Sequence, residues 1–207
     1  MDLIRKPGYE TTEQLWSSNP QILQKFVNTK ILPFILEADP LTLTPYVGDF
    51  YDIGEKNPRM EYLKYYLRRV KQIDSDDFNF DELKAPKVDG VFCFEVLEHL
   101  QNPLFFMKQL MKLTDGYIYV LMPENPRWLW HPMHFMEMKK KHFERWILNP
   151  LDLRIVRQKK ILFVSSWKVY LIGLRPLLKL IAGEIKFMDI IRAMFYVQWR
   201  IYEIRKN

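Results

Sequence analysis

Short apolar runs typical of buried strands alternate with segments of helical periodicity through the middle of the chain. Val91 to Phe94 is an apolar run of the length expected for a strand that is covered on both faces. Leu97, Leu100 and Leu104 then recur at helical spacing, and Ile118 to Met122 forms a second apolar run. This pattern predicts a strand, a helix and another strand in succession.

The flanking segments extend the same alternation. A helix is expected to open at Asn19-Pro20, because Asn is a preferred cap and Pro is tolerated in the first turn, and to end before Pro40. The spacing also predicts helices at 60–69 and 135–148 and strands at 47–53, 70–73, 153–164 and 195–204. Strands separated by helices imply a mostly parallel sheet with right-handed crossovers.

The composition suits one globular domain. The chain has 207 residues, of which 48% are hydrophobic and 27% charged, so it can bury a sizeable core and is too apolar to be disordered. We divide it into a helical cap (1–45), a core (46–165) and an amphipathic segment with the last strand (166–207). The amino-terminal residues contain no apolar stretch of signal-peptide length, so a cytoplasmic location is expected. The sole cysteine, Cys93, lies in an apolar run, which favours a core position over a reactive thiol.

The net charge of +6 favours a solvated basic face. Nucleic acid is disfavoured as a partner, because no arginine-rich or aromatic single-strand-binding signature accompanies the charge. Residues 168–192 are apolar but interrupted by charges, so no run reaches the roughly 18 residues of a membrane span. Two interpretations of this segment remain open: an amphipathic helix that packs on the sheet or on a partner chain, as in a homo-oligomer, or a peripheral contact with a membrane surface.

Polar residues stand where the 91–94 strand should end. Glu95, Glu98 and His99 follow it directly. In an open α/β sheet the positions just past the carboxyl ends of strands face the ligand crevice, so these three are candidate site residues. For His99 a bracing role at the junction of strand and helix is favoured over that of a base.

A loop rich in His and Trp follows the second apolar run. His131, His134 and Glu137 are its available bases or substrate anchors. Aromatic side chains suited to wall an apolar acceptor are Trp128, Trp130 and Phe135. The 131, 134, 137 spacing matches no recognised metal signature and no cysteine supports it, so no metal is expected. The candidate catalytic residues are His99, His134 and Glu137.

Two motifs carry a resemblance to a known family. Phe92-Cys-Phe-Glu-Val-Leu-Glu-His-Leu100, with Asn102-Pro103 after it, resembles the segment after the fourth strand in class I S-adenosylmethionine-dependent methyltransferases, especially the small-molecule branch that includes the ubiquinone and menaquinone methyltransferases. Asp52-Ile-Gly54 resembles the start of their first motif, acidic-x-Gly-x-Gly-x-Gly, although Lys56 and Pro58 replace the second and third glycines. The resemblance covers residues 45 to 160.

The resemblance implies an α/β fold. The expected architecture is a Rossmann-like, doubly wound and mostly parallel sheet of seven strands with an antiparallel last strand. A helical cap precedes this sheet, and a helical insertion comes before its last strand.

The resemblance also implies S-adenosylmethionine as cofactor. Asp74 follows the second strand and matches the acid that holds the ribose hydroxyls, while Asp76 or Asp77 with Phe78 matches the motif that holds the adenine. A local turn cluster remains the alternative for these carboxylates. The residues expected to bind the cofactor are Asp52, Gly54, Glu55, Asp74, Asp76, Asp77, Phe78, Phe94 and Glu95.

The implied function is methyl transfer from S-adenosylmethionine to a small-molecule, glycan or lipid-linked acceptor. The replaced glycines leave an alternative open, because backbone without them approaches a ligand less easily. In that alternative the chain is a catalytically inactive, methyltransferase-like binding or assembly protein. A peripheral contact with the membrane through residues 168–192 is compatible with either function.

Overall fold

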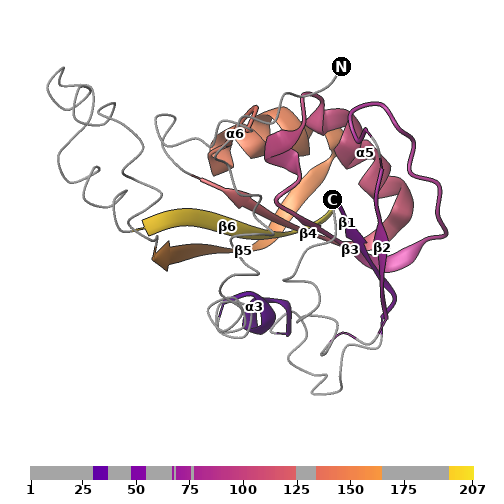
Figure 1. Cartoon of the computed structure of the whole chain (residues 1–207), viewed down its shortest axis with the longest axis horizontal. Coiled ribbons are helices and arrows are strands. Elements are labelled where there is room, and N and C mark those ends of the chain that lie inside the picture. The colour runs from indigo at the N-terminus through magenta and orange to yellow at the C-terminus, as the bar shows by residue number, and fades with distance from the viewer. Residues whose placement is uncertain are drawn as a thin grey trace, which may run out of the picture. The chain divides into compact units, whose positions relative to one another are not determined.

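The computed structural model describes residues 30–36, 48–54, 67, 69–75, 77–124, 134–164 and 196–207. Within these residues there are six strands, which pair in the order β2-β1 in the first part of the chain and β3-β4-β6-β5 in the second (Figure 1). The strands are β1 Phe50–Ile53, β2 Val70–Ile73, β3 Val88–Phe94, β4 Thr114–Pro123, β5 Leu153–Val164 and β6 Tyr196–Lys206. The helices are α3 Leu32–Leu36, α5 Pro103–Leu113 and α6 Lys140–Phe143, with short 3-10 helices at Leu97–His99 and Asn149–Leu151 and a π-helix at Glu144–Leu148. The chain divides into two compact units, Met1–Asp74 and Ser75–Asn207.

The first unit contributes a parallel pair of strands. All four residues of β1 are buried, and β1 pairs with β2 so that Phe50 lies opposite Val70 and Ile53 opposite Ile73. Strand β2 has the predicted bounds, whereas β1 begins three residues later than predicted. Of the predicted helix at 20–38 the structure describes only the end, where α3 includes Pro33. The predicted 60–69 helix lies almost entirely outside the described residues.

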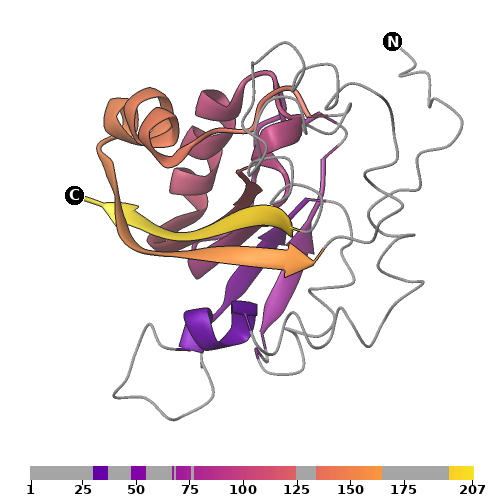
Figure 2. The same ribbon diagram turned by 90° about the vertical axis from the view of Figure 1, so that its left-hand side faces the viewer.

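The second unit holds the predicted strand, helix and strand. Strand β3 runs parallel to β4, and the apolar run at 91–94 is fully buried. Strand β6 is antiparallel to both of its neighbours, β4 and β5. Figure 2 shows α5 and α6 on the same face of the sheet that β4, β6 and β5 form. The mixed α/β class and the antiparallel last strand are confirmed.

The helix predicted from Leu97 onward begins later than its leucine spacing suggests. Leu97–His99 is a single 3-10 turn, Leu100 is extended, and α5 starts at Pro103. The Asn102 side chain accepts a hydrogen bond from the Phe105 backbone nitrogen at 3.2 Å and caps the helix, with Pro103 in its first turn. The turn that carries Glu98 and His99 is therefore a separate element at the end of β3.

A side chain distant in sequence holds this junction in place. The Asn79 Oδ1 atom accepts hydrogen bonds from the backbone nitrogens of Gln101 at 2.7 Å and Asn102 at 2.9 Å. These bonds satisfy donors just ahead of the helix that would otherwise lack intrahelical partners.

The helix predicted at 135–148 is wrong at its start. Helix α6 begins at Lys140, and a segment without regular secondary structure precedes it. In this segment the backbone nitrogens of Phe135 and Met136 donate to the Glu98 carbonyl oxygen at 2.8 and 3.3 Å. These tertiary hydrogen bonds bind the segment to the turn after β3, and they override the local helical spacing.

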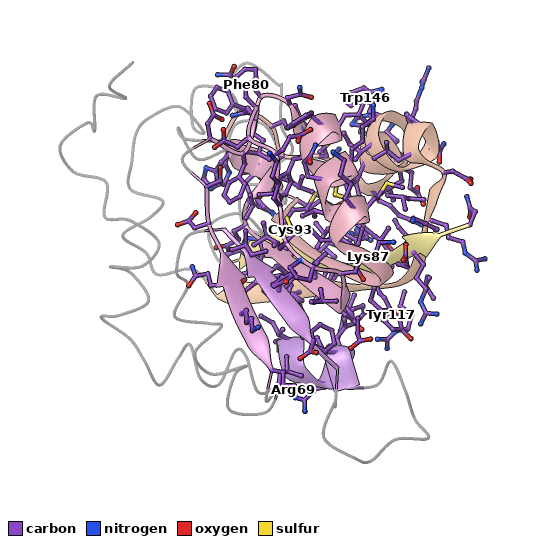
Figure 3. All side chains as sticks on the ribbon, turned by 90° about the vertical axis from the view of Figure 1, so that its right-hand side faces the viewer. Arg69, Phe80, Lys87, Cys93, Tyr117 and Trp146 are labelled. Atoms are coloured by element: carbon purple, nitrogen blue, oxygen red, sulfur yellow. The ribbon has the colours of Figure 1, made fainter. Side chains whose placement is uncertain are left out.

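Six strands lie in the described part of the chain, so the seventh strand of the expected sheet is not confirmed. The expected helical insertion at 166–195 falls outside the described residues, as does most of the helical cap. No helix among the residues that the structure describes has the length and apolar character needed to cross a membrane. Cys93 is fully buried in β3, in agreement with its predicted core position, whereas Phe80 and Trp146 are exposed (Figure 3).

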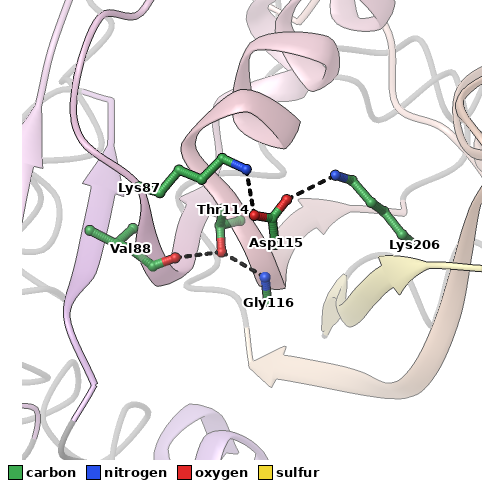
Figure 4. A network of polar contacts seen from close by, with 6 residues as sticks. All are labelled: Lys87, Val88, Thr114, Asp115, Gly116 and Lys206. Atoms are coloured by element: carbon green, nitrogen blue, oxygen red, sulfur yellow. Dashed lines mark hydrogen bonds and ion pairs between the residues drawn. The ribbon is translucent and has the colours of Figure 1, made fainter.

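A polar network joins the amino ends of β3 and β4 (Figure 4). The Thr114 hydroxyl donates to the Val88 carbonyl oxygen at 2.8 Å and accepts from the Gly116 backbone nitrogen at 3.0 Å. Gly116 has no room for a side chain, because an added Cβ would lie 2.0 Å from the Asp89 carbonyl oxygen. Asp115 forms ion pairs with two cations, Lys87 and Lys206.

Candidate functional site

The carboxyl ends of β1 and β2 bring two predicted cofactor residues together. The Gly54 backbone nitrogen donates to the Ile73 carbonyl oxygen at 3.0 Å, so Gly54 lies next to the residue that precedes Asp74. The Gln72 side chain donates to the Gly54 carbonyl oxygen at 3.0 Å and fixes the turn. Gly54 has φ 129°, a conformation that favours glycine. Asp74 is exposed, whereas Asp52 is buried.

The acidic segment after β2 forms a turn closed by its own side chains. Asp77 Oδ1 accepts from the backbone nitrogen of Asn79 at 2.8 Å, and Asp81 Oδ2 accepts from the Ser75 hydroxyl at 2.5 Å. The Ser75 hydrogen bond, with a backbone bond from Asp77, holds the pKa of Asp81 below its ordinary value. These contacts are the ones expected of a local turn cluster, which was the alternative to a cofactor site for these carboxylates. A cofactor role for Asp77 stays a prediction.

Three other predicted cofactor residues lie near this turn or outside the described part. The Phe78 ring packs edge-on against Phe106, with ring centroids 5.2 Å apart. Glu55 and Asp76 fall outside the described residues. The Phe78 side chain therefore packs on α5.

Glu95 stands at the end of β3 in a strained conformation. Its φ of 59° lies in the left-handed region, which costs a non-glycine residue on the order of 1 kcal/mol. Its backbone nitrogen still donates to the Leu121 carbonyl oxygen at 2.8 Å, so the strain is held by the β3–β4 ladder. The preceding Phe94 is 4% exposed, and its ring packs on Phe92 at a centroid distance of 5.5 Å. Strain of this kind is common at functional sites, and a site role for Glu95 stays a prediction.

The three candidate catalytic residues lie in one cluster. His134 Nδ1 and Glu137 Oε1 are 2.6 Å apart, and Glu137 is 6% exposed. The His99 and His134 rings are nearly perpendicular, with centroids 4.7 Å apart. Glu98, which is 2% exposed, lies in the same cluster through its side chain and through the backbone bonds to Phe135 and Met136. We call Glu98, His99, His134 and Glu137 the histidine cluster.

The histidine cluster has the geometry of an oriented base. When the Glu137 carboxylate accepts the proton on Nδ1, Nε2 of His134 is left as the basic nitrogen of a neutral ring. A carboxylate that holds an imidazole in this way fixes both its tautomer and its orientation. The arrangement can therefore bind or deprotonate an ionisable hydroxyl or amine.

The cluster could be anticipated only in part from the sequence. The sequence indicates His134 and Glu137 as candidate bases but not their contact, and both residues stand in a segment without regular secondary structure instead of a helix. The contact between His99 and His134 had no signal in the spacing, because it depends on the backbone bonds to the Glu98 carbonyl. Three residues predicted to contact the acceptor lie outside the described residues: Trp128, Trp130 and His131. The fourth, Phe135, is half-exposed.

Solved structures resemble this chain throughout its length. A SAM-dependent methyltransferase from Archaeoglobus fulgidus matches with a TM-score of 0.53 and 15% identity, covering 88% of this chain and 94% of the other. Magnesium protoporphyrin IX methyltransferase from Synechocystis PCC 6803 with bound SAH matches with a TM-score of 0.53 and 11% identity, covering 96% and 90%. A methyltransferase candidate from Bacillus halodurans C-125 gives a TM-score of 0.57 at 9% identity, covering 85% and 98%.

The chain has the class I methyltransferase fold. No protein-family model matches it, and no curated protein matches it in sequence. The similarity therefore lies in the fold, and the ubiquinone-like branch stays a prediction. In a methyltransferase fold, as in other open α/β sheets, ligands bind outside the carboxyl ends of the strands. Gly54, Asp74 and Glu95 each follow such a strand end, those of β1, β2 and β3.

Proposed function

We propose that this chain transfers a methyl group from S-adenosylmethionine to a small-molecule, glycan or lipid-linked acceptor. The observation that carries the proposal is the neighbouring position of Gly54 and Asp74 at the carboxyl ends of β1 and β2, within a methyltransferase fold. The solved structures that share this fold include methyltransferases with bound SAH, which supports the same cofactor here.

The cofactor half of the proposal assigns a role to each of these residues. Gly54 lets the backbone approach the amino-acid end of the cofactor, because it carries no side chain and takes a φ that other residues disfavour. The Asp74 carboxylate accepts hydrogen bonds from the two ribose hydroxyls. The Gln72 side chain keeps the turn at Gly54 in the binding conformation.

The acceptor half rests on the histidine cluster. Methyl transfer from a sulfonium chiefly requires alignment of donor and acceptor, and a base is needed only where the acceptor loses a proton. The His134–Glu137 pair supplies such a group, since Glu137 fixes the imidazole and leaves its second nitrogen for the acceptor. An apolar acceptor with one ionisable hydroxyl or amine fits this chemistry.

Calorimetric titration with S-adenosylmethionine and with its demethylated product tests the proposal. We expect saturable binding, which Gly54→Val abolishes because it adds bulk and backbone strain where the cofactor approaches. Circular dichroism and thermal unfolding establish whether this variant is folded. No heat and no thermal shift at millimolar cofactor in the wild type would reject methyl transfer in favour of the inactive binding protein.

Turnover separates the acceptor side from the cofactor side. His134→Ala is expected to lower methyl transfer to a true acceptor while cofactor affinity stays nearly unchanged. An equal loss of both would place His134 in the cofactor site and contradict the assignment.

The peripheral-membrane proposal depends on residues 168–192, which lie outside the described residues. Flotation with liposomes of anionic phospholipid tests it, and a chain that stays at the bottom of the gradient would contradict it. Sedimentation tests the proposed homo-oligomer in the same preparation.

A further inference from the structure

The histidine cluster contains a set of ligand atoms that the sequence spacing did not reveal. One atom each from Glu98, His99 and His134 lie within 4.8 Å of one another. Two of the three residues are adjacent on the 3-10 turn after β3, and the third comes from the irregular segment before α6. We propose that these three side chains form a binding site for a divalent first-row transition-metal ion, with Zn(II) as the representative ion.

The ligand types select the class of ion. Imidazole nitrogen suits zinc, copper, iron and nickel, whereas magnesium and calcium prefer sites made of oxygen alone. Two imidazoles and one carboxylate make a three-ligand set, which in zinc proteins is typical of sites that keep a position open for a further ligand. The site is therefore expected to bind Zn(II) or Co(II) and to discriminate against Mg(II).

Glu137 accepts a hydrogen bond from the ring nitrogen that does not bind the metal, as carboxylates beside metal-binding histidines usually do. Its carboxylate lies 2.6 Å from His134 Nδ1 and is buried, and a neutral ring that donates this hydrogen bond presents Nε2 as the ligand atom. Ligand histidines commonly donate their second ring nitrogen to a carboxylate, which fixes the tautomer and raises the basicity of the metal-bound nitrogen. Glu137 is thus a positioning residue in this proposal.

The backbone preorganises the three ligands. The Glu98 carbonyl accepts from the Phe135 and Met136 nitrogens at 2.8 and 3.3 Å, which holds the His134 segment against the 3-10 turn. In a tetrahedral site with bonds of about 2.1 Å the ligand atoms lie about 3.4 Å apart. The His99 imidazole is partly exposed, and its rotation can close the remaining distance while Glu137 holds the His134 ring.

Burial is compatible with a metal ligand at this position. Glu98 is 2% exposed and Glu137 is 6% exposed. Buried carboxylates in proteins are paired or coordinate metals. An ion here would also bind the heteroatom of the acceptor, which the proposed function assigns to His134. Only this role of the ion rests on the proposed methyl transfer.

Zn(II) titration of the full chain after chelator treatment tests the site without any substrate. We expect one equivalent to bind, and Co(II) to bind at the same site with visible absorption bands typical of nitrogen and oxygen ligands. His134→Gln should weaken Zn(II) binding at least about 100-fold, and Glu137→Gln should weaken it about 10- to 100-fold. His142→Gln is the matched control, because that imidazole stacks on Trp146 outside the cluster and should leave affinity unchanged.

Each result decides for or against the site. Absence of saturable Zn(II) binding in the wild type overturns it, as does an equal loss in the His142 and His134 variants. Displacement of Zn(II) by millimolar Mg(II) overturns the assigned ligand set. Circular dichroism reports folding, and His99→Gln is read in place of His134→Gln where that variant is unfolded. Binding of the demethylated cofactor is measured in parallel, so failure of the metal site and failure of the methyl-transfer proposal give different results.

Discussion

Asp74→Ala should weaken cofactor binding by one to two orders of magnitude. Asp74 directly follows β2, and Ile73 before it accepts the Gly54 backbone hydrogen bond at 3.0 Å, so Asp74 adjoins the turn assigned to the cofactor. A hydrogen bond to a charged group contributes about 1.5 to 3 kcal/mol. Because Asp74 is exposed, we take about 1.5 kcal/mol for one ribose hydroxyl and about 3 kcal/mol for two. These values correspond to losses of about 10-fold and about 150-fold in affinity.

The assay is calorimetric titration with the demethylated cofactor, which undergoes no turnover. Asp49→Ala is the matched control: Asp49 is also an exposed carboxylate of the first unit, but it precedes β1 and lies 3.9 Å from Arg69. Glu137→Ala serves as the second comparison, since it removes a carboxylate assigned to the acceptor. Unchanged affinity in Asp74→Ala, or a greater loss in Glu137→Ala, would show that the cofactor had been assigned to the wrong strand ends.

Three further predictions concern stability and are measured by thermal unfolding. Gly116→Ala should destabilise the chain by about 2 to 3 kcal/mol, because its Cβ would meet a β3 carbonyl oxygen at 2.0 Å; unchanged stability would contradict the tight approach of the two strands. Tyr202→Phe should be neutral or stabilising, because burial raises the pKa of this phenol and its hydroxyl has no hydrogen-bond partner in the described part of the chain; a clear loss would reveal an unrecognised partner. Hydrogen bonds from Lys87 and then Lys206 hold the pKa of Asp115 below 3.8, so its stabilising effect is present above that pH and is lost as pH falls through the folded-state pKa. Asp115→Asn should therefore lower the unfolding temperature at neutral pH and lose its effect in acid, and an effect that persists in acid would contradict the ion pairs.

The apolar runs predicted the strands more reliably than periodicity predicted the helices. A strand buried on both faces needs an uninterrupted apolar run, which is why the run at 91–94 located β3 and alternation located β5 with its observed bounds. Helical spacing from Leu97 extended the helix too far toward the amino end, since the capping signal of Asn102-Pro103 marks the true start. The amide of Asn79 completes that junction, and its contribution is invisible in a local window.

The sequence predicts individual residues of the candidate site but not the contacts between them. The sequence places Gly54 and Asp74 after two strands, and the register shows that these strands, β1 and β2, are parallel neighbours. The histidine cluster depends on hydrogen bonds from the Phe135 and Met136 nitrogens to the Glu98 carbonyl, and residue spacing carries no information about such bonds. The absence of a metal was expected from the spacing of His131, His134 and Glu137, whereas the ligand set that we propose takes Glu98 and His99 from another element.

The position of β6 between β4 and β5 has a consequence for folding kinetics. Ile204 of β6 pairs with Ile118 of β4 and with Ile155 of β5. Strands β4 and β5 are therefore joined only through a strand that lies far from both in the sequence. Contacts of large sequence separation slow folding, because the intervening chain must lose entropy before they form. Until β6 is in place, β4 and β5 each expose an unpaired edge that can pair with another molecule. Refolding at rising protein concentration is therefore expected to lose yield to aggregation at this stage.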